Sequence, residues 1–337
     1  MSNGNPPVEL DSVLTRLRTQ FHSPDLRLDG PPQQLSGGFW AENWTLCFAP
    51  VPESALPSRL VLRLAPYTHL AAWENTIQAG VAKQGYPTPQ IYSSDSAHNG
   101  SRAWCVMDFA DGHPLLSSLN GVRTLATLPR LAITLADTLA HAAADLHRLD
   151  IAPIESELTK LRDQPIGAND LIDNYLARID ELPDRSLRLG VEALAAVRPV
   201  VRNRAICHGD LHPLNVLVNG KNYSVLDWTS AQIADPAFDL AYTYTLLANP
   251  PIAAPTALRP TINWTGRHLA NRFVASYLKQ STNQINFDTF DWYRSLQAFR
   301  ILFDLAYWRA NDFTGTRWDH PWFIIEPALR KLVGKSP

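Results

Sequence analysis

The segment AICHGDLHPLNVLV, residues 205–218, places several polar side chains inside an otherwise apolar run. Apolar runs of this kind usually become buried strand or helix, where a polar group without a partner is costly. Asp210 and Asn215 carry oxygen atoms that could bind a cation or accept a proton. Gly209 and Pro213 disfavour regular helix or strand, so we expect a loop. The segment is therefore either a surface turn or a place where these side chains converge.

A β-hairpin is expected directly after this loop. The apolar VLV leads into the turn signal Asn219-Gly220, and the chain returns through YSVLD. A four-residue connection would set Asn215 opposite Leu226, whereas a two-residue turn would shift that pairing by about two residues. Adjacent strands lie ~4.8 Å apart, so in either register Asn215 and Asp227 lie at the same mouth of the hairpin.

Asp210 lies in the loop that leads to this mouth, so three oxygen-bearing side chains are expected to converge: Asp210, Asn215 and Asp227. Magnesium prefers such oxygen ligands and often shares its coordination sphere with substrate phosphates. One carboxylate and the amide could hold the metal, while the other carboxylate accepts the proton of an attacking hydroxyl. Asp-x4-Asn followed by a metal-binding Asp is the pattern of protein-kinase-type phosphoryl transfer. Ordinary turn chemistry of Asp and Asn is the alternative, which the joint pattern disfavours.

The two histidines of the loop, His208 and His212, are four residues apart. That spacing suits zinc on a helix, but Gly209 and Pro213 argue against a helix here. We expect His208 to be a hydrogen-bonded brace of the loop rather than a proton carrier. His212 is given no role.

Bulk properties limit the classes of function. The chain has 337 residues and a formal net charge of −2, which predicts about two domains and no bulk attraction to nucleic acid or an anionic membrane. Cys47, Cys105 and Cys207 are far apart, and we expect buried free thiols in a reducing compartment. The N-terminus lacks a signal-peptide pattern and no uncharged apolar run approaches the length of a membrane span, so we expect a cytoplasmic protein. The oligomeric state is not indicated.

The hydrophobic pattern predicts a strand-rich beginning and a helical remainder. Expected first are a helix over 10–21, strands over 34–40, 44–48, 59–65 and 103–109, and a helix over 70–84. A linker over 110–114 is then followed by a long helix ending at 146, more helix to about 200, the hairpin, and helices to the C-terminus. The aromatic run from Trp292 to Phe323 is expected to pack in the core rather than to form a substrate wall.

The sequence HGDLHPLNVLV, followed by YSVLDWTSAQIADPAFDLA, resembles the aminoglycoside phosphotransferase family, which includes choline-kinase-like and other small-molecule kinases. The resemblance implies an α+β, two-lobed protein-kinase-like fold. Residues 1–109 would form a small antiparallel-sheet nucleotide-binding lobe with a loose tail at 1–7, and 110–337 a larger, mainly helical lobe.

The resemblance also implies roles for particular residues. Asp210 would be the catalytic base, and Asn215 and Asp227 the magnesium ligands. His208 and Asp239 would brace the catalytic loop.

Upstream, the resemblance is looser but covers most of the chain. LSGGFW, with Gly37 and Gly38, resembles the loop over the nucleotide phosphates. Arg63 in LVLRLAP stands where many kinases have lysine, and Glu74 where the family has the helix glutamate that pairs with that cation. VMDFADG resembles the hinge, where the backbone at Asp108, Phe109 and Ala110 would meet adenine. DLHRLD resembles the Leu-His that the family has at the end of a long helix.

Two departures bear on the substrate. Arg63 keeps a fixed positive charge and two parallel donors but differs from lysine in reach and geometry. Trp228 follows Asp227 where protein kinases have Phe-Gly, and only seven residues separate Asp227 from Asp235. That spacing is too short for a protein-substrate platform and favours a small-molecule kinase.

The implied reaction moves the γ-phosphoryl group of ATP or GTP, with Mg²⁺, to a hydroxyl of an antibiotic, an aminosugar, an amino alcohol or another metabolite. A nucleotide-binding pseudokinase acting as a scaffold or sensor is the alternative, favoured by Arg63 and by the absence of Gly-x-Gly-x-x-Gly. A metal hydrolase is a third possibility, which phosphate release without a phosphorylated product would support.

Overall fold

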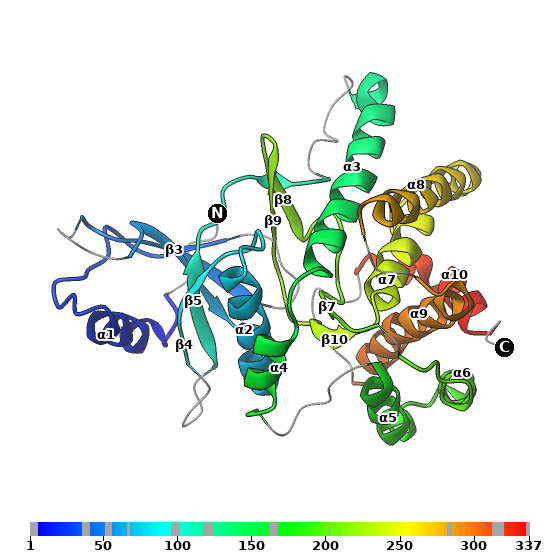
Figure 1. Cartoon of the computed structure of the whole chain (residues 1–337), viewed down its shortest axis with the longest axis horizontal. Helices are drawn as coiled ribbons and strands as arrows, with labels where there is room; N and C mark the ends of the chain where they lie inside the picture. The colour runs from blue at the N-terminus through cyan, green and yellow to red at the C-terminus, as the bar shows by residue number, and fades with distance from the viewer. Residues whose placement is uncertain are drawn as a thin grey trace. The chain divides into compact units, whose positions relative to one another are not determined.

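The computed structural model describes residues 6–35, 41–50, 56–65, 68–95, 102–116, 124–161, 168–201, 203–281, 285–311 and 320–334. The chain divides into two compact units (Figure 1). The first comprises Met1–Gly112 with Ser156–Arg162, and the second His113–Glu155 with Asp163–Pro337.

The first unit is built on an antiparallel sheet with strand order β1-β2-β3-β5-β4. The strands are β1 (Gln33–Gln34), β2 (Glu42–Cys47), β3 (Arg59–Leu64), β4 (Ile91–Asp95) and β5 (Trp104–Asp108). The strands predicted over 44–48, 59–65 and 103–109 are confirmed as β2, β3 and β5, and Gln34 is the only described residue of the predicted 34–40 strand that lies in one. β4 was missed, because IYSSD lacks a clear apolar alternation and contains a register shift between Ile91 and Ser93.

Two helices accompany this sheet. α1 (Leu10–Gln20) buries Val13, Leu14 and Leu17 in the core that the strands supply. α2 (Thr68–Lys83) ends before Gly85, whose φ of +82° is the left-handed conformation that favours glycine after a helix. Pro7 lies in the segment expected to be a loose tail, yet it is buried and its carbonyl accepts a hydrogen bond from the Leu10 N–H.

The second unit is mainly helical. Its helices are α3 (Thr124–Leu146), α4 (Ala152–Leu158, whose last residues belong to the first unit), α5 (Ala168–Arg178), α6 (Arg185–Ala196), α7 (Ala237–Ala248), α8 (Arg259–Gln280), α9 (Phe287–Ala310) and α10 (Trp322–Val333). Short 3-10 turns occur at Ile179–Glu181 and Thr256–Leu258. Two small sheets complete it: β6 (His113–Pro114), β8 (Val216–Asn219) and β9 (Asn222–Val225) in one, β7 (Ala205–Cys207) and β10 (Gln232–Ala234) in the other.

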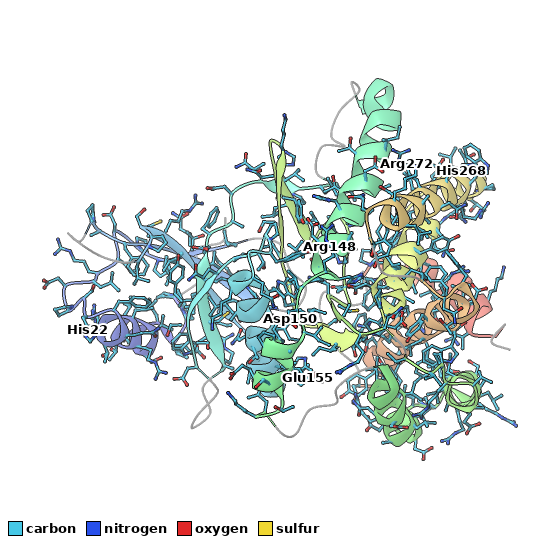
Figure 2. The ribbon with its side chains drawn as sticks, viewed as in Figure 1. His22, Arg148, Asp150, Glu155, His268 and Arg272 are labelled. Atoms are coloured by element: carbon cyan, nitrogen blue, oxygen red, sulfur yellow. The ribbon has the colours of Figure 1, made fainter. Side chains whose placement is uncertain are left out.

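Helix α7 is the centre of this unit. It packs against both α8 and α9, and every residue of the helix except Tyr244 is buried. α3 packs on α8, and their surfaces are joined by Arg272, which donates to Asp137 at 2.6 Å; Arg272 and His268 lie on α8 in Figure 2. Because α7 is buried on almost all sides, its polar side chains are held in fixed positions.

The α+β class predicted from the sequence is confirmed, with an antiparallel sheet early in the chain and helices thereafter. Among the described residues, no helix combines the length and apolar character that crossing a membrane requires. The expected aromatic core is present in α9, where Trp292, Phe299, Phe303 and Trp308 are buried.

Two expectations need correction. Cys105 and Cys207 are buried free thiols, but Cys47 is exposed because it ends β2 on the outward side. The predicted linker over 110–114 is not wholly irregular, since His113–Pro114 forms β6 and pairs with β8.

Candidate active site

The loop that carries Asp210 leaves strand β7, whose partner is β10. Gly209 has a φ of +75°, and a Cβ added there would lie 2.1 Å from the main-chain oxygen of Ser230. Any side chain would therefore collide with backbone as well as strain the left-handed conformation. The glycine lets the loop turn tightly between His208 and Asp210.

Asp239, in the first turn of α7, holds the backbone of this loop. Its Oδ2 accepts the N–H of His208 at 2.7 Å and its Oδ1 accepts the N–H of Gly209 at 2.6 Å. Burial alone would raise the pKa of Asp239, but the hydrogen bond and charge of His147, with the backbone donors, outweigh it and lower that pKa. The carboxylate is thus a buried anchor for two successive amides.

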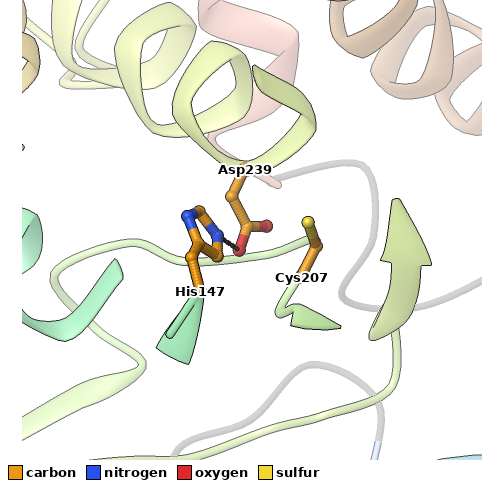
Figure 3. A group of neighbouring side chains, drawn as sticks. All are labelled: His147, Cys207 and Asp239. Atoms are coloured by element: carbon orange, nitrogen blue, oxygen red, sulfur yellow. Dashed lines mark hydrogen bonds and ion pairs between the residues drawn. The ribbon is translucent and has the colours of Figure 1, made fainter. Parts of the chain in front are cut away.

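His147, Cys207 and Asp239 form a buried cluster whose potential ligand atoms lie within 4.8 Å of one another (Figure 3). His147 places Nε2 3.1 Å from Asp239 Oδ2 and Nδ1 2.9 Å from the Tyr277 hydroxyl. Burial raises the pKa of the Cys207 thiol well above its usual range, which disfavours the thiolate that a metal would need. His147 and Asp239 are bonded to each other, and the Cys207 thiol donates to the main-chain carbonyls of Ala234 and Asp235, so the cluster acts as a brace behind the loop.

The His208 side chain is fully buried and uses both of its ring nitrogens. Nε2 lies 2.9 Å from the Leu226 carbonyl, and Nδ1 accepts the Asp210 N–H at 3.3 Å. This pattern assigns the neutral tautomer with the proton on Nε2. Burial lowers the pKa of His208, in keeping with a neutral ring that links the loop to the hairpin.

Asp210 and Asn215 are in direct contact. The Asn215 side-chain amide donates to the Asp210 main-chain oxygen at 3.0 Å and to Asp210 Oδ2 at 3.1 Å. The Tyr242 hydroxyl donates a hydrogen bond to Asp210 Oδ1. Each oxygen of the carboxylate therefore has its own donor, and the side chain is held in one orientation.

His212, which the sequence left without a role, lies beside this carboxylate, with Nε2 3.6 Å from Asp210 Oδ1. Burial would raise the pKa of Asp210, but the charge and hydrogen bond of His212 and the hydrogen bond of Tyr242 lower it to about 2. Burial would lower the pKa of His212, but the charge of Asp210 and its hydrogen bond raise it. Asp210 is thus ionised at neutral pH.

Asn215 lies opposite Leu226, as in the first of the two registers left open by the sequence, but the connection is the two-residue turn Gly220-Lys221 and not the expected four residues, so the expected shift for a two-residue turn was wrong. Asn219 pairs with Asn222, Gly220 takes a φ of +63°, and the Leu226 N–H donates to the Asn215 carbonyl at 2.8 Å. Asp227 therefore follows directly at the mouth where Asn215 lies.

Asp227 itself has a φ of +64°, an uncommon conformation for a residue other than glycine. The Thr229 hydroxyl donates to Asp227 Oδ1 at 2.6 Å. The charge of Asp227 acts to raise the pKa values of both His208 and His212. Backbone strain of this kind is often found at functional sites.

In the first unit, strand β3 and helix α2 bring Arg63 and Glu74 together. Their side chains form an ion pair at 2.8 Å and are 6% and 5% exposed. Cys105 on β5 is paired with Arg63 in the sheet, and burial raises the pKa of its thiol to about 12. The ion pair of Arg63 and Glu74 is therefore buried and not solvated.

The predicted hinge residues follow at the end of β5. The Asp108 carboxylate accepts the Gln90 N–H at 3.0 Å and the Tyr92 hydroxyl at 2.9 Å, which fixes the strand end against β4. The Arg59 guanidinium lies 3.3 Å above the Phe109 ring, and Ala110 follows half-buried. Gly37 and Gly38 lie outside the described residues.

Two neighbours of the loop were missed by the sequence analysis. Tyr242 lies 32 residues from Asp210, and Arg300 of α9 donates to the Gly209 carbonyl at 3.1 Å from 91 residues away. Neither contact has a local sequence signal, although the position of Tyr242 three residues after Asp239 on one helix could have suggested that it faces the loop.

The phosphotransferase enzyme family model matches residues 52–275, about two thirds of the chain. This chain belongs to that family. Small-molecule kinases are the enzyme class that this membership defines, in agreement with the class predicted from the sequence.

Solved structures share the fold over nearly the whole chain. Macrolide 2'-phosphotransferase MphH from Brachybacterium faecium is 19% identical, with a TM-score of 0.55 over 98% of this chain and 99% of that one. A thermostable mutant of aminoglycoside phosphotransferase APH(4)-Ia, in a ternary complex with AMP-PNP and hygromycin B, is 15% identical, with a TM-score of 0.59 over 97% and 99%. At these identities the likeness establishes the fold.

One curated relative matches a short part of the sequence. The uncharacterized protein YcbJ of Bacillus subtilis (strain 168) is 46% identical over 44 residues, which are 12% of this chain. The match spans only 14% of the length of that relative.

Proposed function

We propose that this protein is a magnesium-dependent phosphotransferase that moves the γ-phosphoryl group of ATP or GTP to a hydroxyl group of a small molecule. One observation carries the proposal: the Asn215 side chain is bonded to Asp210, and the Asn215 carbonyl accepts the N–H of Leu226, the residue directly before Asp227. This is the donor set that kinase-type phosphoryl transfer requires.

The donor chemistry fits magnesium. Because the amide nitrogen of Asn215 is committed to Asp210, its amide oxygen is the atom left to bind a cation. Asp227 contributes a carboxylate that Thr229 orients. Asn215 and Asp227 would hold the metal, which when bound neutralises charge on the nucleotide phosphates.

Asp210 is the proposed base. It is ionised, half-buried and held at both oxygens, so it can orient the acceptor hydroxyl and take its proton. The acceptor oxygen forms a bond to the γ-phosphorus as the bond from that phosphorus to the β–γ bridging oxygen breaks. The nucleoside diphosphate leaves with that electron pair, and the proton ends on the Asp210 carboxylate.

The first unit supplies the proposed nucleotide contacts. Glu74 fixes Arg63, whose two parallel donors suit phosphate oxygens. The backbone at Asp108, Phe109 and Ala110 would meet the base, and Gly37 and Gly38 would lie over the phosphates. Complexes of APH(4)-Ia mutants with AMP-PNP or ADP and hygromycin B give these nucleotides and that antibiotic as the first ligands to try.

The test is a screen of hydroxyl-bearing compounds with labelled ATP or GTP and Mg²⁺, with products identified by mass spectrometry. The panel should contain aminoglycosides, including hygromycin B, macrolides, amino alcohols and aminosugars. A phosphorylated product that is absent with Asp210→Asn supports the proposal. Tight Mg·ATP binding without turnover on any compound would favour the pseudokinase, and phosphate release without a phosphorylated product would favour the hydrolase.

A further inference from the structure

We propose that Tyr242 is a positioning residue for the base: its buried hydroxyl holds Asp210 Oδ1 inward, so that Oδ2 is the oxygen that meets the acceptor hydroxyl. This inference rests on the proposed function of Asp210. It begins from the hydrogen bond that the Tyr242 hydroxyl donates to Asp210 Oδ1.

Helix α7 holds the loop one residue at a time. Asp239 binds the amides of His208 and Gly209, and Thr243 donates its hydroxyl to the Leu211 carbonyl at 2.7 Å. Tyr242 binds the side chain of Asp210, the loop residue that lies between Gly209 and Leu211. The other two residues fix backbone, so Tyr242 is the one that acts on the reacting group.

Burial makes this donor rigid. Tyr242 is 1% exposed, on a helix of which all but one residue is buried, and the guanidinium of Arg300 lies 5.7 Å from its ring centroid. The Asp210 side chain is 26% exposed, so part of the carboxylate reaches solvent. Because Oδ1 is bound to a buried phenol, the solvent-facing part is expected to be Oδ2, on the side of Asn215.

The orientation has a kinetic consequence. A half-exposed carboxylate without this tether can occupy other rotamers, in which the proton acceptor is misplaced relative to the acceptor hydroxyl. Small misplacements of reacting groups are costly in rate while leaving ground-state binding largely intact. Loss of the hydroxyl should therefore act on kcat rather than on the KM for the nucleotide.

The experiment compares Tyr242→Phe with Tyr223→Phe. Tyr223 is a matched control, because its hydroxyl also donates to a carboxylate of the second unit, Asp145 Oδ2, at 2.8 Å. The first readout is the carboxyl ¹³C resonance of Asp210 in protein labelled at aspartate, assigned by its loss in Asp210→Asn. We expect Tyr242→Phe to shift this resonance and Tyr223→Phe to leave it in place. An unmoved resonance in Tyr242→Phe overturns the proposal without any acceptor being known.

The second readout is turnover with the acceptor found in the screen. We expect kcat to fall about 10- to 100-fold in Tyr242→Phe, with KM for ATP within about twofold of wild type. The double variant Asp210→Asn/Tyr242→Phe should be no slower than Asp210→Asn alone. An inactive Asp210→Asn beside a fully active Tyr242→Phe overturns the positioning role only, whereas a fully active Asp210→Asn overturns the proposed function itself.

Discussion

The side-chain amide of Asn215 lies 3.1 Å from Asp210 Oδ2, so a proposed metal ligand and the proposed base are joined by one hydrogen bond. The bond has two effects. It orients the carboxylate, and it commits the amide nitrogen of Asn215 to Asp210, which leaves the amide oxygen as the group for a cation. In the proposed mechanism, metal binding and proton acceptance would be coupled through one side chain, and substitutions at the two residues are not expected to be independent.

Asp210→Asn tests the base. The substitution keeps the shape but removes the proton acceptor and the negative charge. Turnover should fall by roughly 10²–10⁴-fold, the usual contribution of acid–base catalysis. Affinity for Mg·ATP, measured by calorimetry, should change little. Turnover close to wild type would exclude Asp210 as the base.

Asp227→Asn tests the metal. Asparagine tolerates the left-handed φ of +64° at this position, so it is a better probe than alanine. Removing the charge should abolish most of the gain in ATP affinity that Mg²⁺ provides, because the phosphates are no longer bridged to protein. Thr229→Val, which removes only the hydroxyl that orients Asp227, should give a smaller loss. The measurement is titration of ATP with and without Mg²⁺, and an equal Mg²⁺ effect in wild type and Asp227→Asn would contradict the assignment.

Much of this site could be predicted from the sequence because it is local. Asp210, Asn215 and Asp227 lie within 18 residues, and Gly209 and the Asn219-Gly220 turn determine how the intervening chain folds. The register of the hairpin was left open by the sequence, but either register places Asn215 and Asp227 at the same mouth. Such features need no knowledge of the rest of the fold.

The contacts that could not be predicted are those made across long sequence separations. Tyr242 and Arg300 reach the loop because α7 and α9 pack beside it, and packing of buried helices is not encoded in any short pattern. His212 is an intermediate case. Its type suggested a ligand, but only the fold places it beside the Asp210 carboxylate.

Asp239→Asn tests the brace behind the loop. An asparagine there would present an N–H₂ to one of the two amide donors of His208 and Gly209, and would also lose the buried charge beside His147. We expect a loss of about 3 kcal/mol in the free energy of unfolding, as for other broken buried polar pairs. Asp291→Asn, which alters an ion pair with Arg294 at an aspartate whose side chain is 81% exposed, is a control that should change stability little.

The pH dependence of this loss has a defined sign. The pKa of Asp239 is lowered in the folded protein from its ordinary value of 3.8. The stabilisation is therefore complete above pH ~4 and is lost as pH falls through the folded-state pKa. Urea unfolding of wild type and Asp239→Asn should give stabilities that converge as pH falls below about 4. A difference that grows as pH falls through this acidic range would contradict this account.

The buried pair of Arg63 and Glu74 permits a test that separates stability from nucleotide binding. Removing one partner leaves an uncompensated buried charge, so Arg63→Met and Glu74→Leu should each cost about 3–5 kcal/mol of stability. The double variant removes both charges with similar volume, so it should recover most of that loss. It should not recover the KM for ATP, because the cation proposed for the phosphates is gone.

Arg63→Lys keeps the charge but not the two parallel donors of the guanidinium, and should bind ATP better than Arg63→Met and less well than wild type. Urea unfolding gives the stabilities and steady-state kinetics the KM values. If the double variant is stable and its KM equals that of wild type, the pair is structural and has no role in binding the nucleotide.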